Sequence, residues 1–249
     1  MAGNVLIVGA SRGIGLEFVR RHLQQPQFSR VFAACRTSQK APRLEALKQE
    51  HPDRLRTLPL DLVDDASIAE AIARLKDQVT RLHRVICCAG LLHDATMQPE
   101  KRLSQIRRAA LEKSFAVNAF GPVLLAQACE DLLHHDEPSL FASLSARVGS
   151  ISDNHLGGWY SYRAAKAAQN MLIRTLALEW QRRRRNTICL LLHPGTTATD
   201  LSAPFQATVP PEKLFTPERT VRQLMAILDR VTLADSGRFL AWDGQEIPW

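Results

Sequence analysis

The sequence has 249 residues, of which 45% are hydrophobic, and it carries a formal net charge of +7. Its length suits one large α/β domain, and its apolar content is ample for a sizeable core. No apolar stretch reaches the ~18 residues that a membrane span needs, and the first residues do not resemble a signal peptide. We therefore expect a cytoplasmic protein with no membrane partner.

The positive charge does not by itself indicate nucleic-acid binding. Four arginines in succession, Arg182–Arg185, fall at the end of a predicted long helix, where cations suit the negative end of the helix dipole. Aromatic residues are few and do not alternate with basic ones, which argues against a nucleic-acid partner. A small anionic ligand is the more economical explanation for the scattered arginines.

The cysteines indicate neither disulfides nor a metal. There are five, an odd number, and no two of them form a C-x-x-C pair. The adjacent Cys87 and Cys88 should point to opposite faces of a strand, so they are not expected to pair. We predict free, buried thiols and no bound metal.

Short apolar runs alternate with segments of helical periodicity along the whole chain. The predicted strands are Asn4–Gly9, Val31–Cys35, Leu55–Leu60, Val85–Ala89, Leu140–Ser145, Thr187–Leu192 and Phe239–Trp242. The predicted helices are Leu16–Gln24, Ala41–Glu50, Ala66–Val79, Ser104–Leu133 with a bend or break at Gly121-Pro122, a run opening at Gly157, and Thr216–Leu228. Ala198–Leu214 is predicted to be a long loop with a short helix at most.

This alternation implies right-handed crossovers between parallel strands. We predict a single domain over residues 1–249, of the Rossmann type. Its doubly wound, mostly parallel α/β sheet should have about seven strands, with helices on both faces. In such a sheet, ligands bind beyond the carboxyl ends of the strands, so the residues that follow each strand are the candidate site.

The first strand leads into a glycine-rich turn. Gly9–Gly15 has the spacing G-x-x-x-G-x-G and precedes a predicted helix. Glycines allow a tight turn and a close backbone approach, and the helix amide end can face a pyrophosphate. We predict a nucleotide-binding turn, with contacts from Gly9, Ser11, Arg12, Gly13, Ile14 and Gly15.

The second strand is followed by a basic residue, Arg36. A site selective for NAD usually has Asp or Glu there to hold the ribose 2′-hydroxyl, whereas a basic residue suits a 2′-phosphate. Arg12 could reach the same phosphate. We therefore predict that NADP(H) is favoured over NAD(H), the alternative being that Arg36 only faces solvent.

Other strand ends add candidates. Asp61, beside Leu62, is a potential partner for the adenine amino group or else a loop cap. A small residue and a glycine, Ala89-Gly90, let the backbone approach a cofactor, and Asn118 invites a hydrogen-bonding role inside an apolar run. The turn after the sixth strand adds Pro194, Gly195, Thr197 and Thr199.

Tyr162 and Lys166 lie four residues apart in a predicted helix, so both side chains share one face. A neighbouring ammonium favours the phenolate and should lower the pKa of the tyrosine from about 10 toward neutrality. Such a tyrosine can donate or accept a proton.

Taken together, these motifs resemble the short-chain dehydrogenase/reductase family over essentially the whole chain. The matching elements are the glycine motif Gly9–Gly15, Ala89-Gly90 at the end of the N-N-A-G element, the helix asparagine Asn118, the Y-x-x-x-K pair Tyr162 and Lys166, and the turn Pro194-Gly195. Finer features resemble its carbonyl-reductase branch, which includes C-factor-like proteins: Ser145–Ile151, Gly157–Arg163 and Trp242–Trp249.

The resemblance implies the roles of individual residues. Tyr162 would exchange a proton with the carbonyl or alcohol oxygen, while Lys166 would lower the tyrosine pKa and hold the nicotinamide ribose. Asn118 would hold a water near Lys166, and a serine after the fifth strand would orient the carbonyl. A homodimer or homotetramer through the long helices is also implied.

The sequence departs from the family pattern at three places. Val8 replaces the threonine before the first glycine, and Cys87 and Cys88 replace the two asparagines of N-N-A-G. The family's serine position, three residues before Gly149, holds Ala146. We assign the catalytic hydroxyl to its neighbour Ser145, with two alternatives: Ser150 contributes, or catalysis proceeds without a serine.

The resulting functional prediction is an NADP(H)-dependent oxidoreductase, a carbonyl reductase acting on a small carbonyl or alcohol substrate. The same residues also allow preferential alcohol oxidation. The alternative from another class is a nucleotide-binding signalling protein that keeps the fold but has little turnover.

Overall fold

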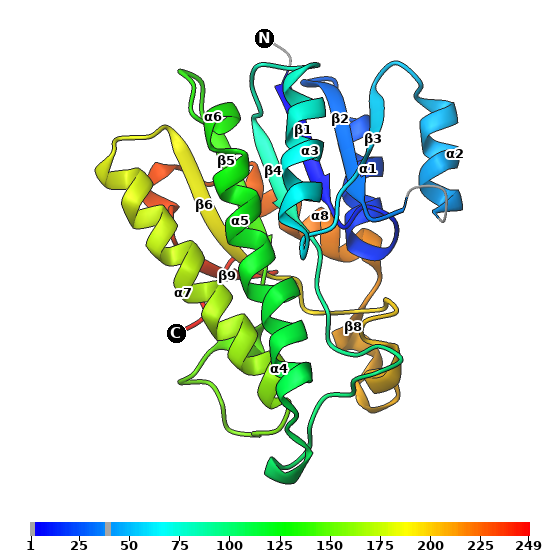
Figure 1. Ribbon diagram of the computed structural model, residues 1–249, viewed down its shortest axis with the longest axis vertical. Coiled ribbons are helices and arrows are strands. Elements are labelled where there is room, and N and C mark those ends of the chain that lie inside the picture. The colour runs from blue at the N-terminus through cyan, green and yellow to red at the C-terminus, as the bar shows by residue number, and fades with distance from the viewer. Residues whose placement is uncertain (1–2, 38–40) are drawn as a thin grey trace.

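The computed structural model describes residues 3–37 and 41–249, built around a seven-stranded parallel sheet (Figure 1). The strands are β1 (Gly3–Val8), β2 (Phe28–Cys35), β3 (Leu55–Pro59), β4 (Arg84–Cys87), β5 (Ser139–Leu144), β6 (Thr187–His193) and β9 (Phe239–Ala241). Their spatial order is β3-β2-β1-β4-β5-β6-β9. The order reverses between β1 and β4, which is the switch point where doubly wound sheets bind ligands. The predicted fold class is confirmed.

Helices cover both faces of this sheet. They are α1 (Gly13–Leu23), α2 (Pro42–Glu50), α3 (Asp65–Lys76), α4 (Arg108–Phe115), α5 (Gly121–Ala128), α6 (Glu130–Leu133), α7 (Tyr160–Arg182) and α8 (Pro217–Leu228). Apolar side chains of α1, α2 and α8 form one core cluster and those of α3, α5 and α7 the other, and Figure 1 shows the second group in front of the sheet. Alternate β1 residues, such as Val5 and Leu6, enter opposite clusters. Burial on both faces explains why the strand sequences are continuously apolar.

The long helical segment before β5 has its irregular turn just before Gly121-Pro122. Instead of breaking at Gly121-Pro122, the helix passes through a π-helical turn, η3 (Ala116–Phe120), and continues as α5. Pro122 lies in the first turn of α5, where its missing N–H costs least. A Cβ on Gly121 would lie 2.7 Å from Leu62 Cβ, so the glycine permits a close contact between the helix and the loop after β3.

The segment after β6 is more ordered than a loop. It contains β7 (Thr196–Thr197), η5 (Ala203–Thr208), η6 (Pro211–Lys213) and β8 (Leu214–Phe215). β7 and β8 pair with each other in a separate two-stranded sheet. This small sheet anchors both ends of the segment, which lies at the carboxyl edge of the main sheet.

Candidate active site

The turns that follow β1 and β4 are in direct contact at the switch point. Gly9 adopts a φ of +82°, and a Cβ there would lie 2.8 Å from the backbone nitrogen of Ala89. A Cβ on Gly15 would lie 2.2 Å from the Gly9 carbonyl oxygen. Both positions therefore require glycine, and the predicted glycine turn lies at the edge where a nucleotide is expected.

The start of α1 is suited to an anion. Its N-cap, Arg12, makes no side-chain cap hydrogen bond, and the first turn contains no acidic residue. The first backbone N–H groups of α1 are thus left for an external acceptor, and the helix dipole favours a negative one. Ser11 lies in the same turn, and Ile14 packs against the core beneath it. This turn fits the pyrophosphate of a dinucleotide.

The two arginines predicted to hold a 2′-phosphate lie on the surface. Arg36 directly follows β2 and is exposed. Arg12 is also exposed, and its guanidinium pairs with Asp200 of the segment after β6. Asp61 Oδ1 accepts a hydrogen bond from the Val63 backbone at 3.2 Å, which is the geometry of a loop cap. Leu62 beside it is buried against Gly121.

Asn118, in the π-helical turn, ties that turn to the loop after β4. The side chain is fully buried, Oδ1 accepts from Leu91 N at 2.9 Å, and Nδ2 donates to Leu91 O at 2.7 Å. A π-turn inside an α-helix frequently marks a functional site. A Cβ on Gly90 would lie 3.5 Å from Asn118 Oδ1 and 4.0 Å from Lys166 Nζ. The structure thus brings three predicted site residues together from three elements.

Tyr162 and Lys166 are buried on the inner face of α7, as their spacing predicts. Lys166 Nζ donates to Leu144 O at 2.9 Å and to Gln169 Oε1 at 3.0 Å. An ammonium group has three protons, so one more is left for a ligand or water. Within the described residues, the Tyr162 hydroxyl makes no hydrogen bond, so nothing in the protein competes with a substrate for its proton.

The predicted lowering of the tyrosine pKa by the lysine is not what this structure shows. Burial raises the pKa of Tyr162 above its usual value, because the phenolate would lose its hydration. Burial also lowers the pKa of Lys166 to about 8. Lys166 Nζ lies 5.6 Å from the centroid of the Tyr162 ring. Desolvation is therefore the main influence on both groups.

Both candidate serines, Ser145 and Ser150, form hydrogen bonds within the protein. Ser145, directly after β5, is buried, and its Oγ donates to Asn170 Oδ1 at 2.6 Å. A hydroxyl has one proton, so this bond occupies the only donor that Ser145 could offer to a carbonyl oxygen. Asn170 lies eight residues beyond Tyr162 on α7, or about 12 Å along the helix axis. Ser150 Oγ accepts from Asp153 N at 3.2 Å.

The side chains of Trp159 and Phe205 form an aromatic wall beside Tyr162. The indole ring of Trp159 lies 6.3 Å from the Tyr162 ring and 4.9 Å from the Phe205 ring, centroid to centroid. His93 lies 6.3 Å from Phe205. Sequence reasoning missed Phe205, because it comes from η5, within the segment predicted to be irregular.

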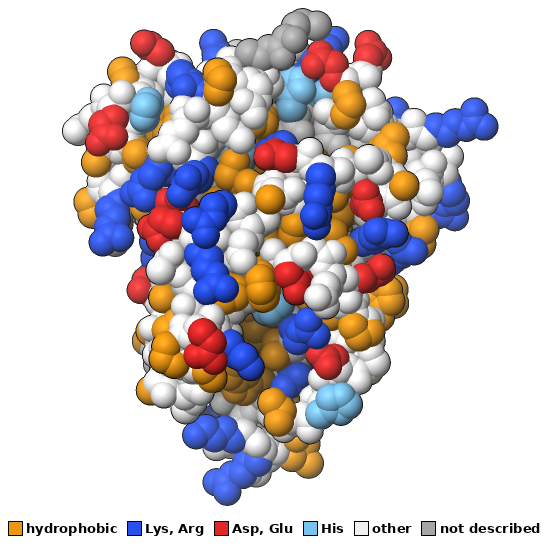
Figure 2. Space-filling view, turned by 180° about the vertical axis from the view of Figure 1, so that it is seen from behind, with side chains coloured by type: hydrophobic (Ala, Val, Ile, Leu, Met, Phe, Trp, Pro, Cys, Tyr) orange, Lys and Arg blue, Asp and Glu red, His pale blue; other side chains and the backbone are white. Residues whose placement is uncertain are grey.

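The segment after β6 reaches across the carboxyl edge of the sheet. Thr199 lies against the glycine turn, 3.1 Å from a Cβ placed on Gly13, and Leu201 lies 3.6 Å from one on Gly90. His93 Nε2 is 3.2 Å from the Asp200 carbonyl oxygen. Figure 2 shows the molecule hollowed on its rear face, with hydrophobic side chains at the bottom of the hollow and Lys and Arg side chains around it.

The remaining predicted residues of this segment are largely held by the protein itself. Thr197 Oγ1 lies 2.7 Å from the Thr220 hydroxyl, and Thr199 Oγ1 donates to the Thr197 carbonyl at 3.4 Å. Gly195, after Pro194, has a φ of +73°, and a Cβ there would clash with the Phe215 ring at 2.6 Å. These contacts give the turn a defined shape at the sheet edge.

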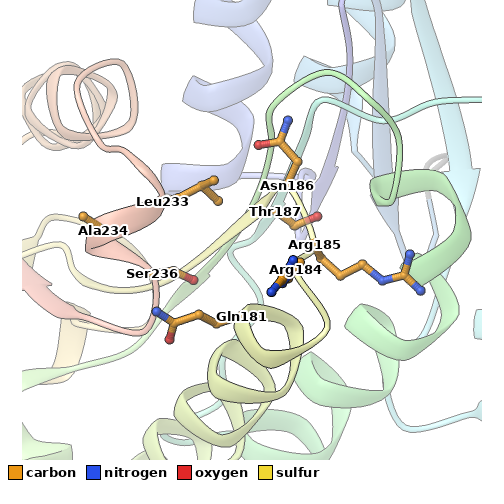
Figure 3. Close-up of a pocket in the computed structure, with 8 residues that line it drawn as sticks. All are labelled: Gln181, Arg184, Arg185, Asn186, Thr187, Leu233, Ala234 and Ser236. Atoms are coloured by element: carbon orange, nitrogen blue, oxygen red, sulfur yellow. The ribbon is translucent and has the colours of Figure 1, made fainter.

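A second hollow lies at the other end of α7 (Figure 3). Its lining residues are Gln181, Arg184, Arg185, Asn186, Thr187, Leu233, Ala234 and Ser236. Because Gln181 is nineteen residues beyond Tyr162, the two are separated by about 28 Å of helix. This hollow is at the amino end of β6, away from the edge that holds the candidate site.

The structure also describes the cysteines, the potential metal ligands and the hydropathy of the helices. All five cysteines are free thiols, and four of them are buried. Across residues 3–37 and 41–249, no cluster of His, Cys, Asp or Glu has the arrangement of a metal site. No helix in this part of the chain has the length and hydropathy to cross a membrane.

Comparison with known proteins identifies the family. Residues 3–210 match the family model described as short chain dehydrogenase. The chain belongs to this family of oxidoreductases. The short chain dehydrogenase match contains the glycine turn, Asn118, Tyr162 and Lys166, and so covers the predicted site.

One curated relative and one solved structure match almost the whole chain, and another curated relative matches part of it. The sequence is 30% identical over 245 residues to a 1-hydroxy-2-glutathionyl-2-methyl-3-butene dehydrogenase from Rhodococcus sp. (strain AD45), covering 98% of this chain and 99% of the relative. It is 33% identical over 147 residues to the C-signal protein of Myxococcus xanthus, covering 59% of this chain and 83% of that one. The NADPH-bound carbonyl reductase from chicken fatty liver superposes with a TM-score of 0.88 at 30% identity, covering 100% and 99% of the two chains.

Proposed function

We propose that this protein is an NADP(H)-dependent oxidoreductase that interconverts a small carbonyl compound and its alcohol. One observation carries the proposal: Lys166, Asn118 and Gly90 lie together at the switch point, with the Tyr162 ring beside the ammonium group. A proton donor, a cation and a site of close backbone approach, at the edge where a nucleotide is expected, are what the proposed reaction requires.

The residues present would hold the cofactor along this edge. We assign the pyrophosphate to the turn Gly9–Gly15 and the amide end of α1, and the 2′-phosphate to Arg12 and Arg36. The nicotinamide ribose would contact the third proton of Lys166. When bound, the nicotinamide supplies or accepts the hydride. The other proposed contacts are Asp61, Leu62, Ala89, Gly90, Tyr162, Pro194, Gly195, Thr197 and Thr199.

Tyr162 acts on the substrate oxygen. In reduction, the Tyr162 hydroxyl gives its proton to the carbonyl oxygen as the carbonyl carbon gains a hydride, and the phenolate is left beside Lys166. Because burial raises its pKa, Tyr162 is protonated at neutral pH, as a proton donor must be. In oxidation the same oxygen acts in reverse, with the Tyr162 phenolate accepting the proton of the alcohol.

Asn118 and Ser145 have different parts in this scheme. Asn118 fixes the loop after β4 against η3, and we assign it to the proton path near Lys166. Ala146 has no hydroxyl at the family's serine position, and Ser145 donates to Asn170. We therefore propose that Tyr162 is the principal donor to the carbonyl and that Ser145 holds β5 against α7.

The relatives support this assignment and also an alternative. The chicken carbonyl reductase was solved with NADPH bound, and a carbonyl reductase from Pseudomonas aeruginosa PAO1 has a TM-score of 0.82 at 30% identity. The match to C-signal favours a signalling protein with little turnover. Assaying NADPH oxidation with a panel of ketones, aldehydes and quinones separates the two. Turnover of at least one carbonyl supports the reductase, whereas NADPH binding without any turnover supports the alternative.

A further inference from the structure

A buried carboxylate from a distant part of the chain contacts the first turn of α7. Glu100, in the segment after β4, is only 3% exposed. Its Oε2 accepts from the Ser161 backbone N–H at 3.2 Å, and its Oε1 accepts from the Ser161 hydroxyl. The Glu100 backbone carbonyl also accepts from Trp159 N. Three hydrogen bonds thus connect Glu100 to the two residues that flank Tyr160, which lie 59 and 61 positions later in the chain.

The start of α7 needs such an external support. Gly157, Gly158 and Trp159 have φ values of +63°, +66° and +51° in succession. The left-handed conformation is disfavoured for a residue with a Cβ, so Trp159 is strained. Trp159 is also the N-cap, and its side chain makes no cap hydrogen bond. The local sequence therefore supplies neither an intrinsic preference nor a cap for beginning the helix at Tyr160.

A carboxylate is the appropriate group for this position. The first backbone N–H groups of a helix lack partners within it, and the dipole favours negative charge there. Among the described residues, Glu100 forms no ion pair with Lys, Arg or His, so its partners are the backbone and the hydroxyl of Ser161. Glu100 thus does from a distance what an N-cap residue does locally.

Tyr162 depends directly on this contact. It is the third residue of α7 and follows Ser161, whose N–H and hydroxyl are both bound by Glu100. Lys166 lies one turn later and has its own anchors, Leu144 O and Gln169 Oε1. Loss of the Glu100 contact should therefore displace Tyr162 more than Lys166.

We propose that Glu100 is a positioning residue that sets the place of the Tyr162 hydroxyl by fixing the left-handed turn and the first turn of α7. The inference rests on the proposed function, in which Tyr162 donates the proton. It predicts a defect in the chemical step with little change in cofactor binding, because a displacement of about 1 Å in a reacting group can reduce rates about 100-fold.

The test compares Glu100→Ala with Glu100→Gln. In Glu100→Ala we expect kcat per folded enzyme to fall about 100-fold, with the Kd for NADPH within about threefold of the wild type. Glu100→Gln keeps an acceptor oxygen for the Ser161 N–H and should return kcat to within about tenfold of the wild type. Glu17 offers a matched control, because it is a buried carboxylate paired with Arg20 and Arg21 on α1. Glu17→Gln should change thermal stability without lowering kcat.

Amide hydrogen exchange gives a readout that does not need turnover. In Glu100→Ala, exchange at Ser161, whose amide loses its carboxylate acceptor, should quicken at least tenfold, while the turn containing Lys166 stays protected. An unchanged kcat, or exchange that rises uniformly along α7, would overturn the inference. If the wild type turns over no carbonyl, the proposed function fails, and the exchange pattern alone decides whether Glu100 fixes the start of α7.

Discussion

The ammonium of Lys166 lies 5.6 Å from the centre of the Tyr162 ring, and both side chains are buried on one face of α7. The pair lies where the turns after β1 and β4 meet. Since burial disfavours charge on both groups, a neutral tyrosine lies beside a lysine whose pKa is about 8. A protonated Tyr162 is the form that the proposed proton donation requires.

Replacing Tyr162 by Phe should lower kcat for carbonyl reduction by about 100-fold or more, because general-acid assistance of this kind contributes about 10²–10⁴. The hydroxyl has no partner within the described residues, so the melting temperature should change little. The Kd for NADPH should rise only slightly, because most of the proposed cofactor contacts come from other residues. Tyr160, 38% exposed and two residues earlier, is the matched control. Steady-state kinetics of Tyr162→Phe and Tyr160→Phe check this, and full activity in Tyr162→Phe would refute the mechanism.

The rate of reduction should fall as the pH rises through about 8. The pKa of Lys166 is lowered to about 8, so its charge is lost there, while Tyr162, whose pKa is raised, stays protonated. Between about pH 6 and pH 7 the rate should be level, because neither group titrates in that range. A pH profile of kcat/KM for a carbonyl substrate measures this. A decline confined to acidic pH would contradict the assignment.

Arg36 should decide cofactor choice. We expect wild-type protein to bind NADPH more tightly than NADH, and Arg36→Ala to weaken NADPH binding about 10- to 100-fold, the value of a charge-assisted contact. NADH binding should hardly change, because it lacks the 2′-phosphate. Arg74, exposed on α3 and paired with Glu70, provides the control. Fluorescence titration of both cofactors is the measurement, and equal affinities in the wild type would remove the basis for the Arg36 assignment.

Trp159 should affect which carbonyl compounds are preferred. Its indole and the Phe205 ring form a wall beside Tyr162, and flat aromatic groups gain about 0.5–1.5 kcal/mol from such packing. We expect Trp159→Leu to lower kcat/KM for acetophenone more than for cyclohexyl methyl ketone, by about 3- to 10-fold in the ratio of the two. Comparing this ratio between the variant and the wild type cancels the intrinsic reactivity of each ketone. An unchanged ratio would show that the wall does not contact the substrate.

Ser145→Ala should have only a moderate effect. Its hydroxyl donates to Asn170, so the variant loses a buried hydrogen bond worth about 1 kcal/mol, and the melting temperature should fall by about 2–4 °C. We expect kcat to fall less than tenfold. A loss above about 100-fold would instead establish Ser145 as the carbonyl-orienting hydroxyl that the sequence suggests.

Much of the fold could be predicted because its determinants are local. Continuous apolar runs mark strands buried on both faces, and their alternation with helical periodicity implies parallel crossovers. The tight turn containing Gly9 and Gly15 could also be predicted, and in the structure only glycine tolerates the contacts at these two positions. The four-residue spacing of Tyr162 and Lys166 placed them on one helix face without any tertiary information.

The rest was decided by contacts between distant segments. Burial, which the spacing does not report, reversed the expected direction of the Tyr162 pKa. Ser145 is adjacent in sequence to the family's serine position, but packing of β5 on α7 commits its proton to Asn170. Glu100 belongs to no recognisable sequence motif, and only the fold brings its carboxylate to the helix that carries Tyr162. Local patterns determined the elements and the reactive pair, whereas desolvation and long-range hydrogen bonds, set by tertiary packing, decided their protonation and their positions.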